Sequence, residues 1–160
     1  WAFYRRYGRD LRTMSEHAVL NANYLRHRIM NPSPEIREKI HAMPADGCPA
    51  DVVKHEFTLS MTPLVDAIGA NGKDVAKRLL DYGYMAPTLY FPMIVPECLM
   101  FEPTETESKQ TLEDFANVLI ELDGKIESDN EYLNSAPYKT PVRRLNETKA
   151  NRELDIKYEK

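Results

Sequence analysis

Apolar residues recur every three or four positions in three stretches of the chain, and this spacing is typical of amphipathic helices. The stretches cover residues 9–30, 73–82 and 104–126. Pro32 follows the first stretch and forbids its continuation. Gly83 follows the second stretch, at a position where a left-handed C-terminal cap is needed. The pattern therefore predicts three main helices, two of them with marked ends.

A second pattern, the alternation of apolar and polar residues, predicts a half-buried strand over residues 53–61. Residues 98–101 are apolar on both faces, which predicts a buried strand. Prolines at positions 87, 92 and 96 confine residues 88–95 to extended structure that cannot be a fully paired central strand. Together these segments predict a small sheet.

Shorter signals complete the order of elements. A short helix is expected over residues 63–68, ending at Gly69. Thr104 and Glu107 have the spacing of a capping box, in which each side chain satisfies the other residue's free backbone donor, and this predicts the start of the third main helix. Prolines and a glycine interrupt residues 32–51, which we interpret as a surface excursion.

Helices and strands in this order predict an α+β domain, with helices packed on one face of a small, mainly antiparallel sheet. We place this domain at residues 1–127. Residues 1–7 are rich in aromatic side chains and lack an N-terminal cap, so we expect them to be the end of a truncated linking helix. Charge rises and apolar content falls from residue 128 onward, which predicts a C-terminal tail over residues 128–160 that packs on a neighbouring surface.

Composition narrows the classes of function. The 160 residues, 42% of them hydrophobic, carry a formal net charge of −4 and an isoelectric point of about 5.6, as expected for one domain. This mild acidity argues against a nucleic-acid partner. No apolar run approaches the ~20 residues of a membrane helix, which argues against a membrane partner. Cys48 and Cys98 lack metal-ligand spacing, which predicts reduced thiols in a cytoplasmic protein, with a single disulfide left open.

Four segments carry a resemblance to a known family. The most specific is residues 81–109, DYGYMAPTLYFPMIVPECLMFEPTETESK, which combines a helix stop, a proline-bounded segment, an apolar strand and a helix start. The others are residues 16–25 (EHAVLNANYL), residues 55–57 (HEF) and residues 134–144 (NSAPYKTPVRR). In this order, they resemble the C-terminal region of the P-protein family, the pyridoxal-phosphate-bearing subunit 2 of glycine dehydrogenase (decarboxylating) in the glycine cleavage system.

The resemblance implies the small C-terminal domain of a fold-type-I, aminotransferase-like enzyme. In that family the cofactor and its lysine lie upstream of the matched region, so no catalytic, cofactor-binding or metal-binding residue is expected here and the isolated chain should be inactive. The intact enzyme decarboxylates glycine and passes the aminomethyl group to the lipoyl arm of the H-protein. The implied partners are the large domain of the same subunit, glycine dehydrogenase subunit 1 and the H-protein.

Three residues are candidates for lining the substrate cleft or channel, and each has a structural alternative. Thr88 lies in a proline-stiffened loop and could present its hydroxyl to a ligand or only stabilise a turn. His55 falls on the apolar side of its predicted strand, where it is either a hydrogen-bonded core residue or reaches the cleft. Glu102 follows the buried strand and could face the cleft. Glu105 and Glu107 are instead expected in the first turn of the third main helix, where the helix dipole favours negative charge.

Other interpretations stay open. A stand-alone interaction or regulatory module could share the fold. The chain could also belong to another fold-type-I enzyme such as an aminotransferase, but this interpretation is weakened because residues 98–106 lack an arginine to hold a substrate carboxylate. We also expect apolar surface for a neighbouring domain, with self-association of the isolated chain. The aromatic residues expected on that surface are Trp1, Phe3, Tyr4, Tyr90 and Phe91.

Overall fold

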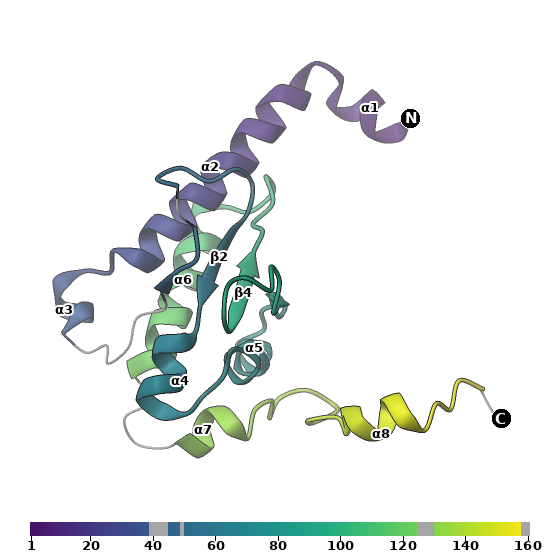
Figure 1. Cartoon of the computed structure of the whole chain (residues 1–160). Helices are drawn as coiled ribbons and strands as arrows, with labels where there is room; N and C mark the ends of the chain where they lie inside the picture. Colours follow the sequence, from purple (N-terminus) through teal and green to yellow (C-terminus); the bar gives the residue numbers. More distant parts are fainter. Residues whose placement is uncertain (39–44, 49, 125–129, 158–160) are drawn as a thin grey trace.

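The computed structural model (Figure 1) describes residues 1–38, 45–48, 50–124 and 130–157 and shows an α+β fold, as predicted. The helices are α1 Ala2–Tyr7, the 3-10 turn η1 Gly8–Asp10, α2 Leu11–Met30, α3 Pro34–Arg37, α4 Thr62–Ile68, α5 Gly72–Asp81, α6 Lys109–Gly124, α7 Asn130–Asn134 and α8 Glu147–Arg152. The strands are β1 Ala45–Asp46, β2 Phe57–Ser60, β3 Thr88–Leu89 and β4 Cys98–Phe101. No helix in these described ranges is both long and apolar enough to span a membrane.

The four strands form one antiparallel sheet in the order β1-β2-β4-β3. Phe57 lies opposite Phe101, and their rings stack with centroids 5.3 Å apart. Leu59 lies opposite Leu99, and all four of these side chains belong to the buried core. The predicted buried strand at residues 98–101 is thus confirmed as a central strand of the sheet.

Helices α2 and α6 pack against each other, and α2 also contacts β2 (Figure 1). Their apolar residues, among them Leu25 and Leu112, join the core formed by the sheet. The predicted helix at residues 9–30 is confirmed, except that a 3-10 turn occupies its first residues. The predicted end of the third helix at residue 126 lies outside the described residues, and α6 is described to Gly124.

The predicted capping box at the start of α6 is wrong. The helix begins at Lys109, because the hydroxyl oxygen of Ser108 accepts the backbone N–H of Thr111 at 3.1 Å. Thr104 and Glu107 instead close a turn before the helix, in which the Glu107 N–H donates to the Thr104 carbonyl at 3.2 Å. Glu105 and Glu107 therefore precede the helix, and the expectation that they lie in its first turn is also wrong.

The strand predicted over residues 53–61 from the alternating pattern is too long, and its residues are more buried than the half-buried strand expected. Only Phe57–Ser60 is strand, and all four residues are buried. Loops cover the polar side chains of this strand, since Thr58 Oγ1 lies 3.6 Å from Cys48 Sγ and the Ser60 hydroxyl donates to the Pro96 carbonyl at 2.6 Å. The expected surface excursion supplies part of this cover, including the edge strand β1.

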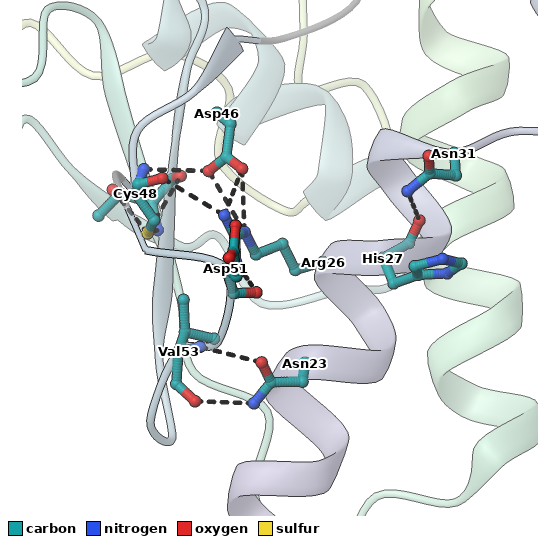
Figure 2. A network of polar contacts seen from close by, with 9 residues as sticks. Asn23, Arg26, His27, Asn31, Asp46, Cys48, Asp51 and Val53 are labelled. Atoms are coloured by element: carbon teal, nitrogen blue, oxygen red, sulfur yellow. Dashed lines mark hydrogen bonds and ion pairs between the residues drawn. The ribbon is translucent and has the colours of Figure 1, made fainter.

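A single arginine of α2 holds this covering segment in place (Figure 2). Nη2 of Arg26 lies 2.5 Å from Oδ2 of Asp46, and its Nη1 and Nη2 donate to the carbonyls of Asp51 and Cys48 at 3.0 and 3.3 Å. One turn earlier, the Asn23 amide exchanges two hydrogen bonds with the backbone of Val53, at 2.7 and 2.9 Å. The segment between β1 and β2 is therefore fixed to the helix by side chains.

The turns around α4 and α5 are mostly as predicted. Gly69 and Gly83 adopt the left-handed conformation, with φ of 70° and 83°. Asn71 is the N-cap of α5 and forms a capping box with Asp74.

The proline-rich segment after α5 is only partly extended. Residues Thr88–Leu89 form an edge strand, which confirms that this segment is not a central strand. Tyr90 then has a φ of 57°, and the Val95 N–H donates to the Pro92 carbonyl at 3.1 Å, so turns replace the extended structure expected for residues 92–95.

The C-terminal part contributes to the core, contrary to the expectation that it would pack only on another surface. Leu133 and Ala136 are buried to 1% and 0% exposure, and Leu133 belongs to the main core. The predicted domain boundary at residue 127 lies outside the described residues and remains a prediction.

Candidate functional site

A hollow of about 370 Å³ opens between the edge of the sheet and the two long helices. Its apolar lining comes from α2, α6 and the β3–β4 edge, with Leu25, Leu112 and Phe115 among the residues involved. Its polar lining includes Thr88 and Glu102. The lining is completed by Tyr84, Met85, Ala86, Pro87, Met100, Phe101, Pro103, Glu107 and Thr111.

Thr88, in the edge strand β3, and Glu102, just after β4, therefore line the same hollow. The antiparallel pairing of β3 with β4 places Thr88 opposite Met100, two residues before Glu102. Thr88 is exposed, and the side chain of Glu102 retains 57% exposure, so both can meet a ligand or a neighbouring surface. Their assignment to a substrate cleft stays a prediction.

His55 lies outside the hollow lining but contacts its rim. Because β2 begins only at Phe57, His55 is not part of a strand, and its side chain is 52% exposed rather than part of the core. Its Nε2 lies 3.6 Å from Glu102 Oε1 and 3.8 Å from Glu56 Oε2. The expectation of a core histidine is wrong, and the alternative of a histidine beside the cleft remains a prediction.

The ligand atoms of His55, Glu56 and Glu102 lie within 4.8 Å of one another, close enough to share a divalent cation. An imidazole and two carboxylates are ligand types that such cations accept. All three side chains are largely solvated, with 44% to 57% exposure. Solvated carboxylates commonly cluster without a metal, so we assign no metal centre to them.

Tyr84 is a residue of the hollow that the sequence did not single out. Its ring meets Phe115 edge to face, with centroids 4.9 Å apart, so one wall of the hollow is aromatic. Burial raises the pKa of its phenol above 10.0, and the carboxylates of Asp114 and Glu107 raise it further. The phenol therefore stays protonated at neutral pH and can donate a hydrogen bond. Its place just after the helix stop at Gly83, in the same tract as Thr88, was the signal that could have identified it.

The hollow does not fit pyridoxal phosphate. An imine link to the cofactor requires a lysine, and its phosphate requires cationic side chains or free backbone N–H groups. No lysine, arginine or histidine occurs among the residues that line the hollow, and its charged groups are the carboxylates of Glu102 and Glu107. Two carboxylates would repel a phosphate.

Comparisons with known proteins agree with the resemblance seen in the sequence. Residues 14–140 match the family described as glycine dehydrogenase, C-terminal domain. The chain is 42% identical over 159 residues to a probable glycine dehydrogenase (decarboxylating) subunit 2 of Thiobacillus denitrificans (strain ATCC 25259 / T1), covering 99% of this chain and 31% of that protein. For the proteins of the same description from Aquifex aeolicus (strain VF5) and Alkaliphilus oremlandii (strain OhILAs), the identities are 45% over 157 and 46% over 154 residues.

These matches cover 98% and 96% of this chain but only 30% and 29% of the Aquifex and Alkaliphilus proteins. The chain thus spans less than a third of the length of these curated relatives. The similarity nevertheless extends across nearly all of the present sequence, including the hollow and the segments that build it. The chain therefore belongs to the glycine dehydrogenase C-terminal domain family.

Proposed function

We propose that this chain is the C-terminal part of a cytoplasmic glycine dehydrogenase (decarboxylating) subunit 2 and forms one wall of the cleft in which the intact enzyme handles glycine. The observation that carries the proposal is the similarity of nearly the whole chain to one named subunit at 42% to 46% identity. Similarity of this extent favours part of an enzyme over a stand-alone module. The α+β fold is compatible with the small domain of a fold-type-I enzyme.

In the intact enzyme, pyridoxal phosphate would supply the electron sink for decarboxylation. Its lysine and phosphate ligands would come from the upstream part of the subunit, because the hollow described above does not fit the cofactor. The partners would be the large domain, subunit 1 and the lipoyl arm of the H-protein.

The residues of this chain would act by positioning and by excluding water. Thr88 offers a hydroxyl at the edge of the hollow, and the Tyr84 phenol is a second hydrogen-bond donor. The apolar wall around Phe115 would accept an aliphatic group and lower the local dielectric constant. With no cation in the lining, the glycine carboxylate would be held by groups from outside this chain.

The test replaces the matching C-terminal third of the Aquifex aeolicus relative by this chain and measures exchange of carbon dioxide with the carboxyl group of glycine, with subunit 1 and the H-protein added. Thr88→Val removes one hydroxyl at nearly constant volume, and the loss of one hydrogen bond predicts exchange reduced several-fold, up to about tenfold. The melting temperature should be unchanged, because Thr88 is exposed. Thr13→Val, on the exposed surface of α2 away from the hollow, is the matched control and should leave exchange intact.

A chimera that folds but does not exchange carbon dioxide would contradict the proposed function. Equal exchange by the Thr88 and Thr13 variants would instead restrict Thr88 to a structural role. The isolated chain, mixed with pyridoxal phosphate, should show no saturable absorbance band that depends on one of its lysines.

A further inference from the structure

The C-terminal segment divides into a part that includes buried residues and a part that is exposed throughout. Residues 130–144, here called the strap, lie against α5, whereas every residue from 145 to 157, here called the arm, is exposed. The arm contains the helix α8 and the apolar side chains of Leu145, Leu154 and Ile156, which are 64%, 75% and 88% exposed.

The strap is held by a buried charge pair. Arg78 and Asp81 of α5 are 4% and 6% exposed, and their side chains are 2.8 Å apart. Arg78 pairs with Oδ2 of Asp81, and the other carboxylate oxygen, Oδ1, accepts hydrogen bonds from the backbone N–H groups of Tyr138 and Lys139, both at 2.6 Å. The guanidinium of Arg78 lies 3.9 Å from the ring centre of Tyr132, a cation–π contact that stabilises a charge buried this deeply.

A second pair fixes the end of the strap. Arg144 donates from Nη2 to the buried carboxylate of Asp74 at 2.6 Å, and from Nε to the Ala136 carbonyl at 2.6 Å. The arm begins at the next residue. Its first part is aligned by the ion pair between Lys73 and Glu147, with 2.6 Å between Nζ and Oε1.

Among the described residues, the arm has regular structure with little support: one ion pair, Lys73 with Glu147, links α8 to α5. Helix α8 has six residues and no buried residue, and Asn146 caps it by accepting the Lys149 N–H at 2.9 Å. A helix this short is unstable in water by itself, since most helix stability in proteins comes from packing an apolar face. Burying the exposed apolar residues of the arm against another surface would lower the free energy.

Two observations identify that surface. The curated relatives are about three times as long as this chain, and the matched family is the C-terminal domain, so in those relatives a large part of the subunit precedes the matched region. Helix α1 also has no buried residue, and Trp1 is 90% exposed. In Figure 1 both α1 and the arm project beyond the sheet toward the right of the view. In this view, a body on that side would lie next to both α1 and the arm.

We infer that the arm, residues 145–157, is a docking arm that binds the upstream part of the same subunit and is presented for this by the strap. The inference rests on the proposed function in one respect, namely that the chain is part of a longer subunit 2. The contact would be mixed in character, because Leu154 and Ile156 alternate with charged residues along the last part of the arm.

The experiment compares trypsin cleavage in the arm between this chain alone and the full-length chimera with the Aquifex aeolicus relative, without subunit 1. Cleavage after Lys149 and Arg152 should be at least tenfold slower in the chimera. Leu154→Asp should return the chimera to the rate of the isolated chain carrying the same change. Val52→Asp is the matched control, since Val52 is 71% exposed and lies far from the arm in sequence, and it should leave the protection intact.

Equal cleavage rates in the chimera and the isolated chain would overturn the inference. Protection that appears only with subunit 1, or that rises with the concentration of the isolated chain, would also overturn it, because subunit 1 or a second copy would then cover the arm. Hydrogen exchange of the matching segment in the unaltered Aquifex aeolicus relative is a second measurement that does not depend on the chimera folding, and fast exchange there would contradict the inference. Carbon dioxide exchange by the chimera reports separately on the proposed function, so an active chimera with an unprotected arm refutes the docking arm alone.

Discussion

Arg26→Met should destabilise the chain far more than the same change at Arg12, although both arginines lie on α2 and both form an ion pair. The Arg26 side chain is 12% exposed and reaches Asp46 together with two backbone carbonyls. The Arg12 side chain is 89% exposed and, among the described residues, pairs only with Glu16, one turn along the same helix, at 2.7 Å. Methionine keeps most of the aliphatic stem, so the comparison isolates the charged group.

The expected magnitude follows from the hydrogen bonds that methionine cannot make at position 26. A hydrogen bond to a charged group contributes about 1.5–3 kcal/mol, and a partly solvated pair lies at the low end of that range. Asp46 keeps 28% exposure, so water can replace part of the interaction with the guanidinium. Adding the two carbonyls, we expect Arg26→Met to lower the free energy of unfolding by about 2–3 kcal/mol. Arg12→Met should cost about 0.5 kcal/mol or less, as is usual for an exposed pair one helical turn apart.

Urea unfolding followed by circular dichroism measures both changes, with thermal melting as a check. For a chain of this size, 2–3 kcal/mol corresponds to a fall in melting temperature of about 4–12 °C. If both variants lose the same stability, the covering segment between β1 and β2 is not held by Arg26. A smaller urea m-value in the Arg26 variant alone would indicate that the segment is already detached in the native state.

Three further predictions concern packing, ionisation and surface. Gly47→Ala should lower the urea midpoint by the equivalent of about 1–3 kcal/mol, because its Cβ would lie 2.5 Å from Thr58 Oγ1; an unchanged midpoint would show that the loop moves freely. The Tyr24 hydroxyl donates to Glu113 at 2.5 Å, and this hydrogen bond lowers the pKa of Glu113 below 4.5 and is the main cause that raises the pKa of Tyr24 above 10.0. The stabilisation is complete above pH 4.5 and is lost as the pH falls through the lower pKa of folded Glu113, and it is lost again as the pH rises through the raised pKa of folded Tyr24. The difference in melting temperature between wild type and Tyr24→Phe should therefore be largest between these limits, and a constant difference across pH would refute this assignment. The isolated chain should bind an apolar dye and self-associate through the exposed aromatic surface predicted from the sequence, and a monomeric, dye-silent chain at high concentration would contradict that expectation.

The elements that could be predicted from the sequence are those whose signals are local. The helix α2, the central strand β4 and the glycines that end α4 and α5 each follow from spacing or from one residue type. The start of α6 was predicted wrongly because two capping signals, at Thr104 and at Ser108, lie four residues apart. Tertiary contact decided between them, since the Asn21 amide of α2 binds the carbonyls of Thr104 and Glu107 at 2.8 and 3.2 Å and holds that turn outside the helix.

The same contrast between local sequence signals and tertiary contacts applies to the candidate site. Thr88 and Glu102 could be named because each follows or precedes a proline that marks a boundary, but their common hollow depends on the pairing of β3 with β4, which joins residues that no local pattern connects. His55 was misplaced because the apparent alternation runs on through residues 53–56, which are not part of the strand. The buried charge pair of Arg78 with Asp81 could not be anticipated from helical periodicity, because it faces the strap rather than solvent.

In the part of the chain that the structure describes, the sheet is bounded on both sides by strands of two residues, β1 and β3. A long, straight edge would offer free backbone N–H and C=O groups to another chain, and such edges are common starting points of fibrous aggregation. Here the four-residue strands β2 and β4 are both internal, and turns follow the outer strand β3 at once. Association of the separated chain should consequently proceed through side chains and be reversible on dilution, without the growth of β-structure that would be detected by an amyloid-binding dye.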